Sequence, residues 1–211
     1  MRRISLYLGT VLVLFVGFTL GVYTQGRDTG EQVSLQCRPS APETLAGAPA
    51  VLVWGNSLAF DHGWQVPGHL VVNCARQGMT AEAAVPLTEA LPRMPIEAVV
   101  LIFGTVELVR PAKPDAAFQA AMSTIRTRLQ ALYPEARLIV VGIPGAAEVW
   151  SYADRPELGA LNEVLAGLGG TFLDVSETLA AVPGARRSYD GVHLTAESYG
   201  ALEARLAEIL R

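Results

Sequence analysis

Ser57, Asp190 and His193 are the residues whose types and spacing indicate nucleophilic chemistry. Ser57 follows an apolar stretch, where a strand that gives way to a turn or helix exposes a hydroxyl at a sheet edge. That hydroxyl is a weak nucleophile unless a base accepts its proton, and His193 is a suitable base. Asp190 lies three residues before His193, across a glycine-containing turn, close enough to orient the imidazole. Taken singly, Ser57 is also explained as a helix cap, and the Asp190–His193 pair as a turn before a helix.

The other residues able to bind a metal are scattered along the chain. His62 and His69 are remote from His193 in the sequence, and Cys37 and Cys74 lack the spacing of metal ligands. The sequence contains no glycine-rich phosphate loop between a predicted strand and helix. We therefore predict neither a metal site nor a cofactor.

Short, almost wholly apolar stretches alternate with longer amphipathic ones from residue 49 onward, which favours a parallel sheet covered on both faces by helices. The predicted strands are Ala50–Trp54, His69–Cys74, Ala98–Phe103, Arg137–Ile143 and Thr171–Val175. The predicted helices are Ala81–Leu91, Asp115–Tyr133, Glu157–Leu168 and Ala196–Leu210. The expected architecture is an α/β fold, a three-layer α/β/α sandwich with a five-stranded parallel sheet.

The polar residues of interest fall in the loops of this predicted sheet. Open parallel sheets bind ligands outside the carboxyl ends of their strands, where the connecting loops meet. Ser57, Gly78 and Glu107 follow the first, second and third predicted strands. Asp190 and His193 lie just before the last predicted helix. The predicted fold therefore brings these residues to one edge of the sheet.

Together these segments resemble the SGNH branch of the GDSL hydrolase superfamily over residues 49–211. The family's Gly-Asp-Ser block is matched around Asn56 and Ser57, with Asn56 in place of the aspartate. Gly78 matches the glycine of the second block, and Asp190 to His193 match the final Asp-x-x-His block. The resemblance implies a flavodoxin-like fold and a serine esterase or acylhydrolase without a cofactor. It also implies that Ser57 attacks an ester carbonyl, His193 transfers the proton and Asp190 orients His193.

The third block departs from the family pattern. The family has Gly-x-Asn-Asp there, with the asparagine amide as an oxyanion donor, whereas this chain has Gly-Thr-Val-Glu at residues 104–107. Val106 has no side-chain donor, and losing one oxyanion donor costs about 3 to 4 kcal/mol. The remaining expected donors are the backbone N–H groups of Ser57 and Gly78. Asn56 is a substitute donor in one interpretation, and in another its side chain braces the turn.

Other residues near these blocks have mainly structural interpretations. Glu107 stands where the family has an aspartate, and we expect it to support the loop by accepting hydrogen bonds from backbone N–H groups. Trp64, Trp150 and Tyr152 lie in predicted loops and form either part of a substrate wall or ordinary packing.

The amino terminus predicts a membrane anchor. The 20 residues from Ile4 to Tyr23 carry no charge and follow two arginines, and a helix of that length spans the roughly 30 Å hydrocarbon layer. The positive-inside rule then predicts a single-pass protein of the inner membrane with a periplasmic or extracytoplasmic domain. Residues 1–24 are the expected anchor, 25–48 a linker and 49–211 the hydrolase domain. The alternative is a signal peptide whose cleavage releases a secreted protein, although no convincing cleavage site follows the apolar segment.

The cysteine content agrees with such a location, and the charge excludes one class of partner. An oxidising compartment allows Cys37 and Cys74 to form a disulfide. Otherwise Cys74 is a small buried residue at the end of a strand and Cys37 is free. The chain has 16 basic and 20 acidic residues, and two of the arginines precede the anchor, so the remainder is acidic and a poor binder of nucleic acid.

The predicted function is that of a membrane-anchored extracytoplasmic serine esterase acting on an acylated glycan or lipid. The short domain without a recognisable lid favours small acyl groups, and therefore deacetylation of a glycan. Two alternatives stay open. One is a non-catalytic envelope binding or assembly module, which Val106 favours, and the other is an O-acyltransferase with the same triad. The sequence identifies no protein partner.

Overall fold

The computed structural model describes residues 35–39, 47–109, 116–145, 148–152, 155–183 and 187–211. The chain divides into two units, Met1–Ser34 and Leu35–Arg211, and the described residues all belong to the second. The predicted anchor, Ile4–Tyr23, lies outside these residues. Within the described ranges, no helix is long and apolar enough to cross a membrane.

A sheet with the strand order β1-β3-β2-β4-β5-β6 forms the centre of the second unit. Strands β2 to β6 run parallel, and β1 pairs antiparallel with β3 at one edge. The bounds are β1 Arg38–Pro39, β2 Ala50–Gly55, β3 Leu70–Asn73, β4 Ala98–Ile102, β5 Arg137–Val141 and β6 Thr171–Leu173. The five predicted parallel strands are all present, and β1 is an addition that the apolar pattern did not predict.

Burial accounts for the apolar composition of the central strands. Every residue of β2 and of β4 is buried, because helices cover both faces of a parallel sheet. Gly55 ends β2 so close to β4 that a Cβ atom there would overlap the Ile102 carbonyl oxygen. This close approach explains the glycine that precedes Asn56 and Ser57.

The helical segments are α2 Ser57–Phe60, α3 Ala81–Ala84, η2 Pro86–Ala90, α4 Thr105–Val109, α5 Ala116–Leu132, η3 Trp150–Tyr152, α6 Glu157–Ala166, α7 Val175–Ala180 and α8 Ala196–Leu210. The predicted helix Ala81–Leu91 is divided into α3 and the 3-10 helix η2, because Pro86 has no N–H to continue the helical hydrogen bonds. The other three predicted helices are present, as α5, α6 and α8. Helices α2, α4 and α7 were not predicted, since segments of four to six residues are too short to show a helical period.

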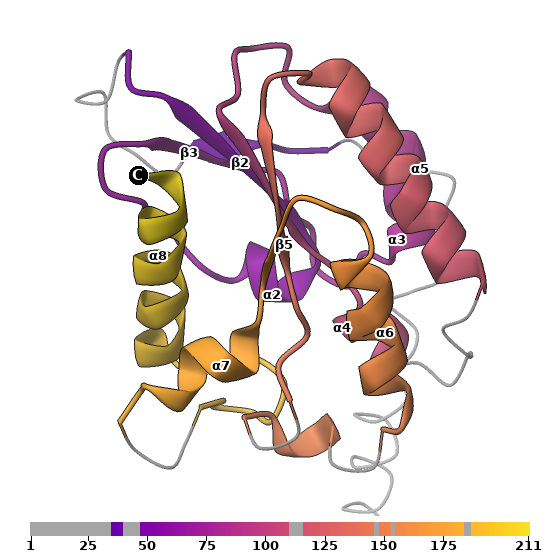
Figure 1. Cartoon of the computed structure of the whole chain (residues 1–211), viewed down its shortest axis with the longest axis vertical. Coiled ribbons are helices and arrows are strands. Elements are labelled where there is room, and N and C mark those ends of the chain that lie inside the picture. Colours follow the sequence, from indigo (N-terminus) through magenta and orange to yellow (C-terminus); the bar gives the residue numbers. More distant parts are fainter. Residues whose placement is uncertain (1–34, 40–46, 110–115, 146–147, 153–154, 184–186) are drawn as a thin grey trace, which may run out of the picture. The chain divides into compact units, whose positions relative to one another are not determined.

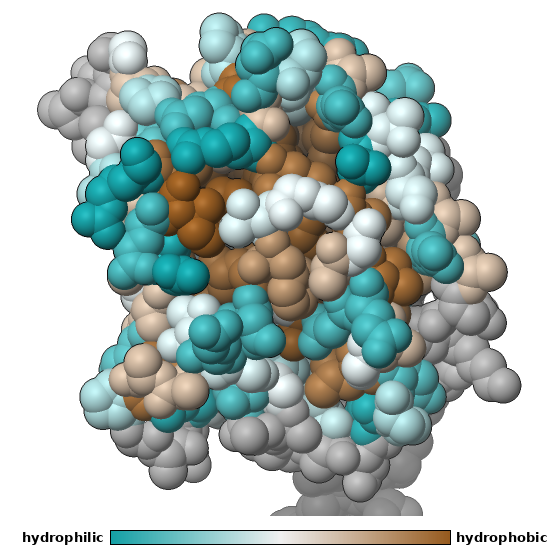
Figure 2. Space-filling view, in the orientation of Figure 1, coloured by the Kyte–Doolittle hydropathy of each residue, from teal (hydrophilic) through white to brown (hydrophobic). Residues whose placement is uncertain are grey.

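Helices cover both faces of the sheet, which confirms the three-layer α/β/α sandwich. Figure 1 shows α7 and α8 on one side of the sheet and α3, α5 and α6 on the other. In the same orientation, Figure 2 shows apolar side chains in the middle of the face, over the sheet between α8 and α5, with hydrophilic residues around them. Core residues that are 0% exposed come from both strands and helices, among them Leu52, Leu101, Ile125 and Leu206.

The predicted disulfide between Cys37 and Cys74 is present. It joins the residue before β1 to the residue after β3, and so reinforces the antiparallel edge pair. The guanidinium of Arg38, in β1, lies 5.5 Å from the ring centroid of Phe60 at the end of α2. Part of the stretch predicted as a linker, 25–48, thus contributes to the sheet.

Candidate active site

The strand order places the loop after β2 at a topological switch. Strands β3 and β4 lie on opposite sides of β2, and ligands bind to open α/β sheets where the order reverses in this way. The Asn56 side chain bridges the loops after β2 and β4, because its amide N–H donates to Thr105 Oγ1 at 2.6 Å. Its carbonyl accepts from the Leu58 N–H at 3.1 Å. Asn56 is fully buried, so this geometry supports the interpretation in which its side chain braces the turn.

Ser57 begins α2 directly after this turn, with Asn56 as the N-cap. Its side chain and backbone are largely buried, at 9% exposure. The first N–H groups of an α-helix have no intrahelical acceptor, so the Ser57 N–H lies at the electropositive end of this short helix. One turn later, the Asp61 N–H donates to the Ser57 carbonyl at 3.0 Å. Ser57 and Asp61 therefore lie one above the other on the helix.

A tight loop before α8 carries Asp190 and His193. A β-bridge closes the base of this loop. Ser151, in η3, donates both its N–H and its hydroxyl to the Gly191 carbonyl, which ties the loop to the segment after β5. Thr195 then caps α8 by accepting a hydrogen bond from a first-turn N–H. The loop is thus held at its base, at its tip and at the start of the helix that follows.

Asp190 is bonded to His193 in two ways. Its Oδ1 accepts from the backbone N–H groups of Val192 and His193 at 2.9 and 2.7 Å, and its Oδ2 lies 2.7 Å from His193 Nδ1. Partial burial acts to raise the pKa of Asp190, but these hydrogen bonds outweigh it and lower the pKa overall. The carboxylate is therefore kept ionised against Nδ1, the contact that fixes the orientation of an imidazole.

The Nε2 atom of His193 is buried and has no hydrogen-bond partner. It is therefore not bonded to Ser57 Oγ in this structure. The Asp61 Oδ2 atom lies 3.5 Å from Nε2. Because Asp61 ends the helix that Ser57 begins, the imidazole faces α2.

Contacts between α8 and α2 hold the histidine loop against the serine turn. The Tyr199 hydroxyl, on α8, donates to the Leu58 carbonyl of α2 at 3.0 Å. The Tyr199 ring stacks on His62 with centroids 4.1 Å apart, and His62 Nε2 lies 2.9 Å from Glu203 Oε1. His62 is therefore part of this helix contact rather than of the Asp190–His193 loop.

The remaining predicted residues occupy the neighbouring loops. Gly78 is exposed in the turn after β3, with a left-handed φ of 66° that favours glycine. Val106 is buried within α4, at 7% exposure. Glu107 Oε1 accepts from the Ala81 N–H at the start of α3, at 2.6 Å, which confirms its expected structural role.

Thr105, Asp61 and Tyr189 lie at the site but were not predicted. The signal for Thr105 was a hydroxyl two residues after the third predicted strand, and the signal for Asp61 was its position four residues after Ser57. Tyr189 directly precedes Asp190, and its ring stacks on His193 with centroids 5.9 Å apart.

Two of the three aromatic residues proposed as a substrate wall, Trp64 and Tyr152, are packed into the protein. Trp64 and Tyr152 are each 1% exposed, and the Trp64 indole N–H donates to the Ala59 carbonyl at 2.9 Å. Burial raises the pKa of Tyr152, and the nearby charge of Asp190 adds to the effect. For Trp64 and Tyr152 the packing interpretation is therefore the right one.

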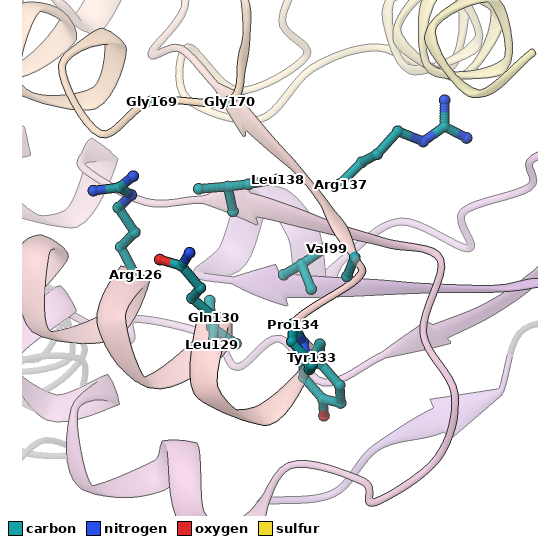
Figure 3. Close-up of a pocket in the computed structure, with 11 residues that line it drawn as sticks. Val99, Arg126, Leu129, Gln130, Tyr133, Pro134, Arg137, Leu138, Gly169 and Gly170 are labelled. Carbon is teal, nitrogen blue, oxygen red and sulfur yellow. The ribbon is translucent and has the colours of Figure 1, made fainter.

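A cavity of about 140 Å³ lies at the amino ends of the strands, opposite the candidate active site. Figure 3 shows its lining, with Arg126 and Gln130 from α5 on one side and residues 169–170, before β6, on another. Arg137 points away toward α8, where its guanidinium donates to carbonyls at the carboxyl end of that helix. The lining residues lie near the amino ends of the strands, so this cavity is separate from the candidate active site. Nowhere in the described ranges do three or more His, Cys, Asp or Glu residues form a group able to hold a metal ion.

The fold and the loops define a class of protein: a three-layer α/β domain with serine, histidine and aspartate beyond the carboxyl ends of its parallel strands. The model of the GDSL-like lipase/acylhydrolase family matches residues 24–201. The chain belongs to this family of esterases and acylhydrolases.

Solved structures share this fold. A GDSL-like lipase from Bacteroides thetaiotaomicron has a TM-score of 0.59 and 19% identity, over 76% of this chain and 87% of that chain. An acetylxylan esterase from Geobacillus stearothermophilus has a TM-score of 0.60 and 16% identity, over 78% of this chain and 94% of that chain. Comparison with curated protein sequences finds no match.

Proposed function

We propose that the protein is a serine esterase in which Ser57, His193 and Asp190 form a catalytic triad. The observation that carries the proposal is the environment of the His193 ring. Its Nδ1 is bonded to Asp190, while its buried Nε2 has no hydrogen-bond partner and faces α2. An imidazole oriented through one nitrogen, with the other able to exchange a proton, has the arrangement that a general base requires. Membership of an acylhydrolase family agrees with ester hydrolysis.

The chemistry proceeds through an acyl-enzyme. Ser57 Oγ attacks the ester carbonyl carbon while His193 Nε2 accepts the hydroxyl proton. The bond to the alcohol oxygen then breaks, and Nε2 returns the proton to that oxygen. Water attacks the acyl-enzyme with His193 again as the base, which releases the carboxylic acid and restores Ser57. Because Ser57 and His193 are not bonded here, substrate binding must bring Oγ and Nε2 together before the first step.

The oxyanion site is the weak part of this mechanism. The backbone N–H groups of Ser57 and Gly78 are its proposed donors. Val106 has no donor to add, and the Asn56 amide is already bonded to Thr105. With one donor fewer than the family pattern, we expect a rate about a hundredfold to a thousandfold lower than a complete site would give.

The proposed location is outside the cytoplasm, with residues 4–23 as the anchor. The disulfide between Cys37 and Cys74 supports an oxidising compartment. The short domain without a recognisable lid insertion favours small acyl groups over a long acyl chain. A short acyl group such as acetyl is therefore the proposed substrate group, and an O-acetylated glycan, as in the acetylxylan esterase of the same fold, is the proposed carrier.

Labelling of the full-length protein with a fluorophosphonate probe tests this function. We expect one adduct at Ser57, lost in Ser57→Ala and retained in the matched control Ser176→Ala, since Ser176 bonds to Glu148 away from the triad. Ser57→Ala and His193→Ala should each abolish hydrolysis of a small activated acetyl ester, and the double variant should lose no more. A folded protein that neither labels nor hydrolyses esters would overturn the proposal in favour of a binding module.

A further inference from the structure

The position of the alcohol part of the substrate follows from the proposed mechanism. In the step that releases the alcohol, His193 Nε2 gives its proton to the leaving oxygen, so that oxygen must lie within hydrogen-bond distance of Nε2. The groups that surround Nε2 therefore contact the alcohol part of the ester. From these groups we infer that Asp61 and Tyr189 form a subsite for a sugar ring. The inference rests on the proposed function and deepens it.

Asp61 supplies a carboxylate beside His193 Nε2, where the alcohol part of the ester must lie. Its Oδ2 lies 3.5 Å from His193 Nε2, and its side chain is 30% exposed, so part of it remains open to a ligand. The Asp61 backbone is fixed by the bond from its N–H to the Ser57 carbonyl. A carboxylate accepts hydrogen bonds only, and sugar hydroxyls are donors that suit it.

Tyr189 supplies an exposed aromatic ring on the same histidine. Tyr189 is 61% exposed, and its ring stacks on His193 with centroids 5.9 Å apart and planes 20° apart. Its backbone N–H is bonded to the His193 carbonyl at 3.1 Å, so the backbone that carries the ring is fixed within the loop. Among the described residues, the large hydrophobic side chains that are exposed are Tyr189 and Val109. An aromatic ring left in solvent beside a catalytic group is a surface on which the apolar face of a sugar can stack.

The charges and exposed rings of this subsite favour one class of alcohol in the ester over others. Two carboxylates, Asp61 and Asp190, contact the His193 ring, so an anionic headgroup such as a phosphate ester would be repelled. A quaternary ammonium alcohol needs several rings around its charge, whereas Tyr189 is the one large aromatic side chain that is exposed among those the structure describes. Tyr199 and Tyr152 are buried at 5% and 1% exposure. A neutral ring with several hydroxyl groups matches one exposed aromatic face and one acceptor.

A comparison of two acetyl esters tests the subsite. The substrates are a monoacetylated methyl xyloside, which carries a sugar ring, and ethyl acetate, which does not. Tyr189→Ala should lower the ratio of their kcat/KM values, sugar ester over ethyl acetate, by about fivefold to tenfold. Tyr189→Phe, the matched control that keeps the ring, should hold the ratio within about twofold. Asp61→Asn should lower the ratio in the same direction as Tyr189→Ala.

Binding to Ser57→Ala separates this inference from the proposed function. Unacetylated methyl xyloside should perturb the NMR signals of Tyr189 and His193 in Ser57→Ala. The additional change Tyr189→Ala should remove the perturbation of the His193 signals. Binding without any ester hydrolysis by the parent would leave the subsite standing while the esterase proposal falls. A ratio unchanged in both Tyr189→Ala and Asp61→Asn, or a preference for acetylcholine that Tyr189→Ala abolishes, would overturn the sugar subsite.

Discussion

At the scale of single residues, the Asn56 side chain, in the turn before Ser57, makes hydrogen bonds that support the structure of that turn. The family pattern has an aspartate at this position, and either side chain can cap α2. The amide of Asn56 does more, because it also donates to Thr105 across the switch between β2 and β4. Its capping carbonyl and this N–H are both used, and the residue is 0% exposed. The oxyanion donor that Val106 lacks is therefore not easily replaced by Asn56.

Restoring that donor is a direct test at this scale. Val106→Asn should raise kcat toward a small acetyl ester, by up to about a hundredfold if the amide reaches the developing negative charge. The new amide enters a position that is 7% exposed, and an unsatisfied buried amide costs about 1 to 3 kcal/mol, so unfolding must be measured beside the rate. Val106→Leu, which adds bulk without a donor, is the control and should not gain activity. A well-folded Val106→Asn protein with an unaltered or lower rate would show that another donor already serves the oxyanion.

Asp190 provides a prediction with a pH dependence. Asp190→Asn should lower kcat by a hundredfold or more, since the imidazole loses the carboxylate that orients it. The pKa of Asp190 is lower than the ordinary carboxyl pKa, so its contribution to stability is present above that ordinary value and lost as the pH falls through the lowered pKa. The parent should therefore be more stable than Asp190→Asn in denaturant titrations at pH 7 and pH 5, with the difference shrinking below about pH 4. A difference that grew with acidity would contradict this assignment.

At the scale of elements, the site depends on contacts between short helices and strands that would not be stable alone. Helix α2 has a single turn, and β1 has only two residues, both exposed. The long helix α8 steadies α2 through the Tyr199 hydroxyl, and the disulfide between Cys37 and Cys74 holds β1 on β3. Short elements that could not form alone thus contribute to the structure around the turn that carries Ser57.

The disulfide predicts a stability difference that should be larger than any effect on catalysis. Cys37 and Cys74 are 37 residues apart, and closing a loop of that length is worth up to about 4 kcal/mol in the chain-entropy model. Cys37→Ser should lower the free energy of unfolding by a large part of that amount while changing kcat/KM less than about threefold. Non-reduced peptide mapping of the parent should find the bridge. Reductant should destabilise the parent and leave Cys37→Ser unchanged, and recovery of both cysteines as free thiols from fresh protein would contradict the pairing.

At the scale of the whole molecule, the disulfide and the amino-terminal apolar segment agree on the compartment. A structural disulfide is typical of oxidising environments, and under the positive-inside rule the two arginines before Ile4–Tyr23 would place the cytoplasm on the side of the amino terminus. The domain would then meet esters outside the cytoplasm. Its substrates would be components of the cell surface or its surroundings.

Topology provides the prediction at this scale. Protein extracted from membranes should retain its original amino terminus if the 20 uncharged residues Ile4–Tyr23 form the proposed anchor, since no convincing cleavage site follows them. Protease added outside the inner membrane should digest the domain, and protease confined to the cytoplasm should leave it intact. A mature terminus between residues 20 and 48 would show a cleaved signal peptide instead.

Features that depend on neighbouring residues could be predicted from the order of the amino acids. The apolar composition of β2 and β4 requires burial on both faces, which is enough to predict parallel strands between helix layers. Asp190 and His193 are three residues apart, so chain connectivity alone brings the carboxylate to the ring. Helix α8 was predicted from its period because 15 residues repeat an apolar face several times.

Contacts between side chains that are distant in the sequence depend on the tertiary structure and could not be predicted. Asn56 and Thr105 are 49 residues apart, and Tyr199 and Leu58 are 141 apart. The approach of Asp61 to His193 likewise depends on how α8 packs on α2. A hydropathy pattern predicts which face of a helix or strand is buried. Burial depends on the total apolar area removed from water, so small shifts of the side chains change its free energy little. A hydrogen bond is lost when its two atoms move apart by less than 1 Å, and no local pattern specifies the placement of two loops to that precision.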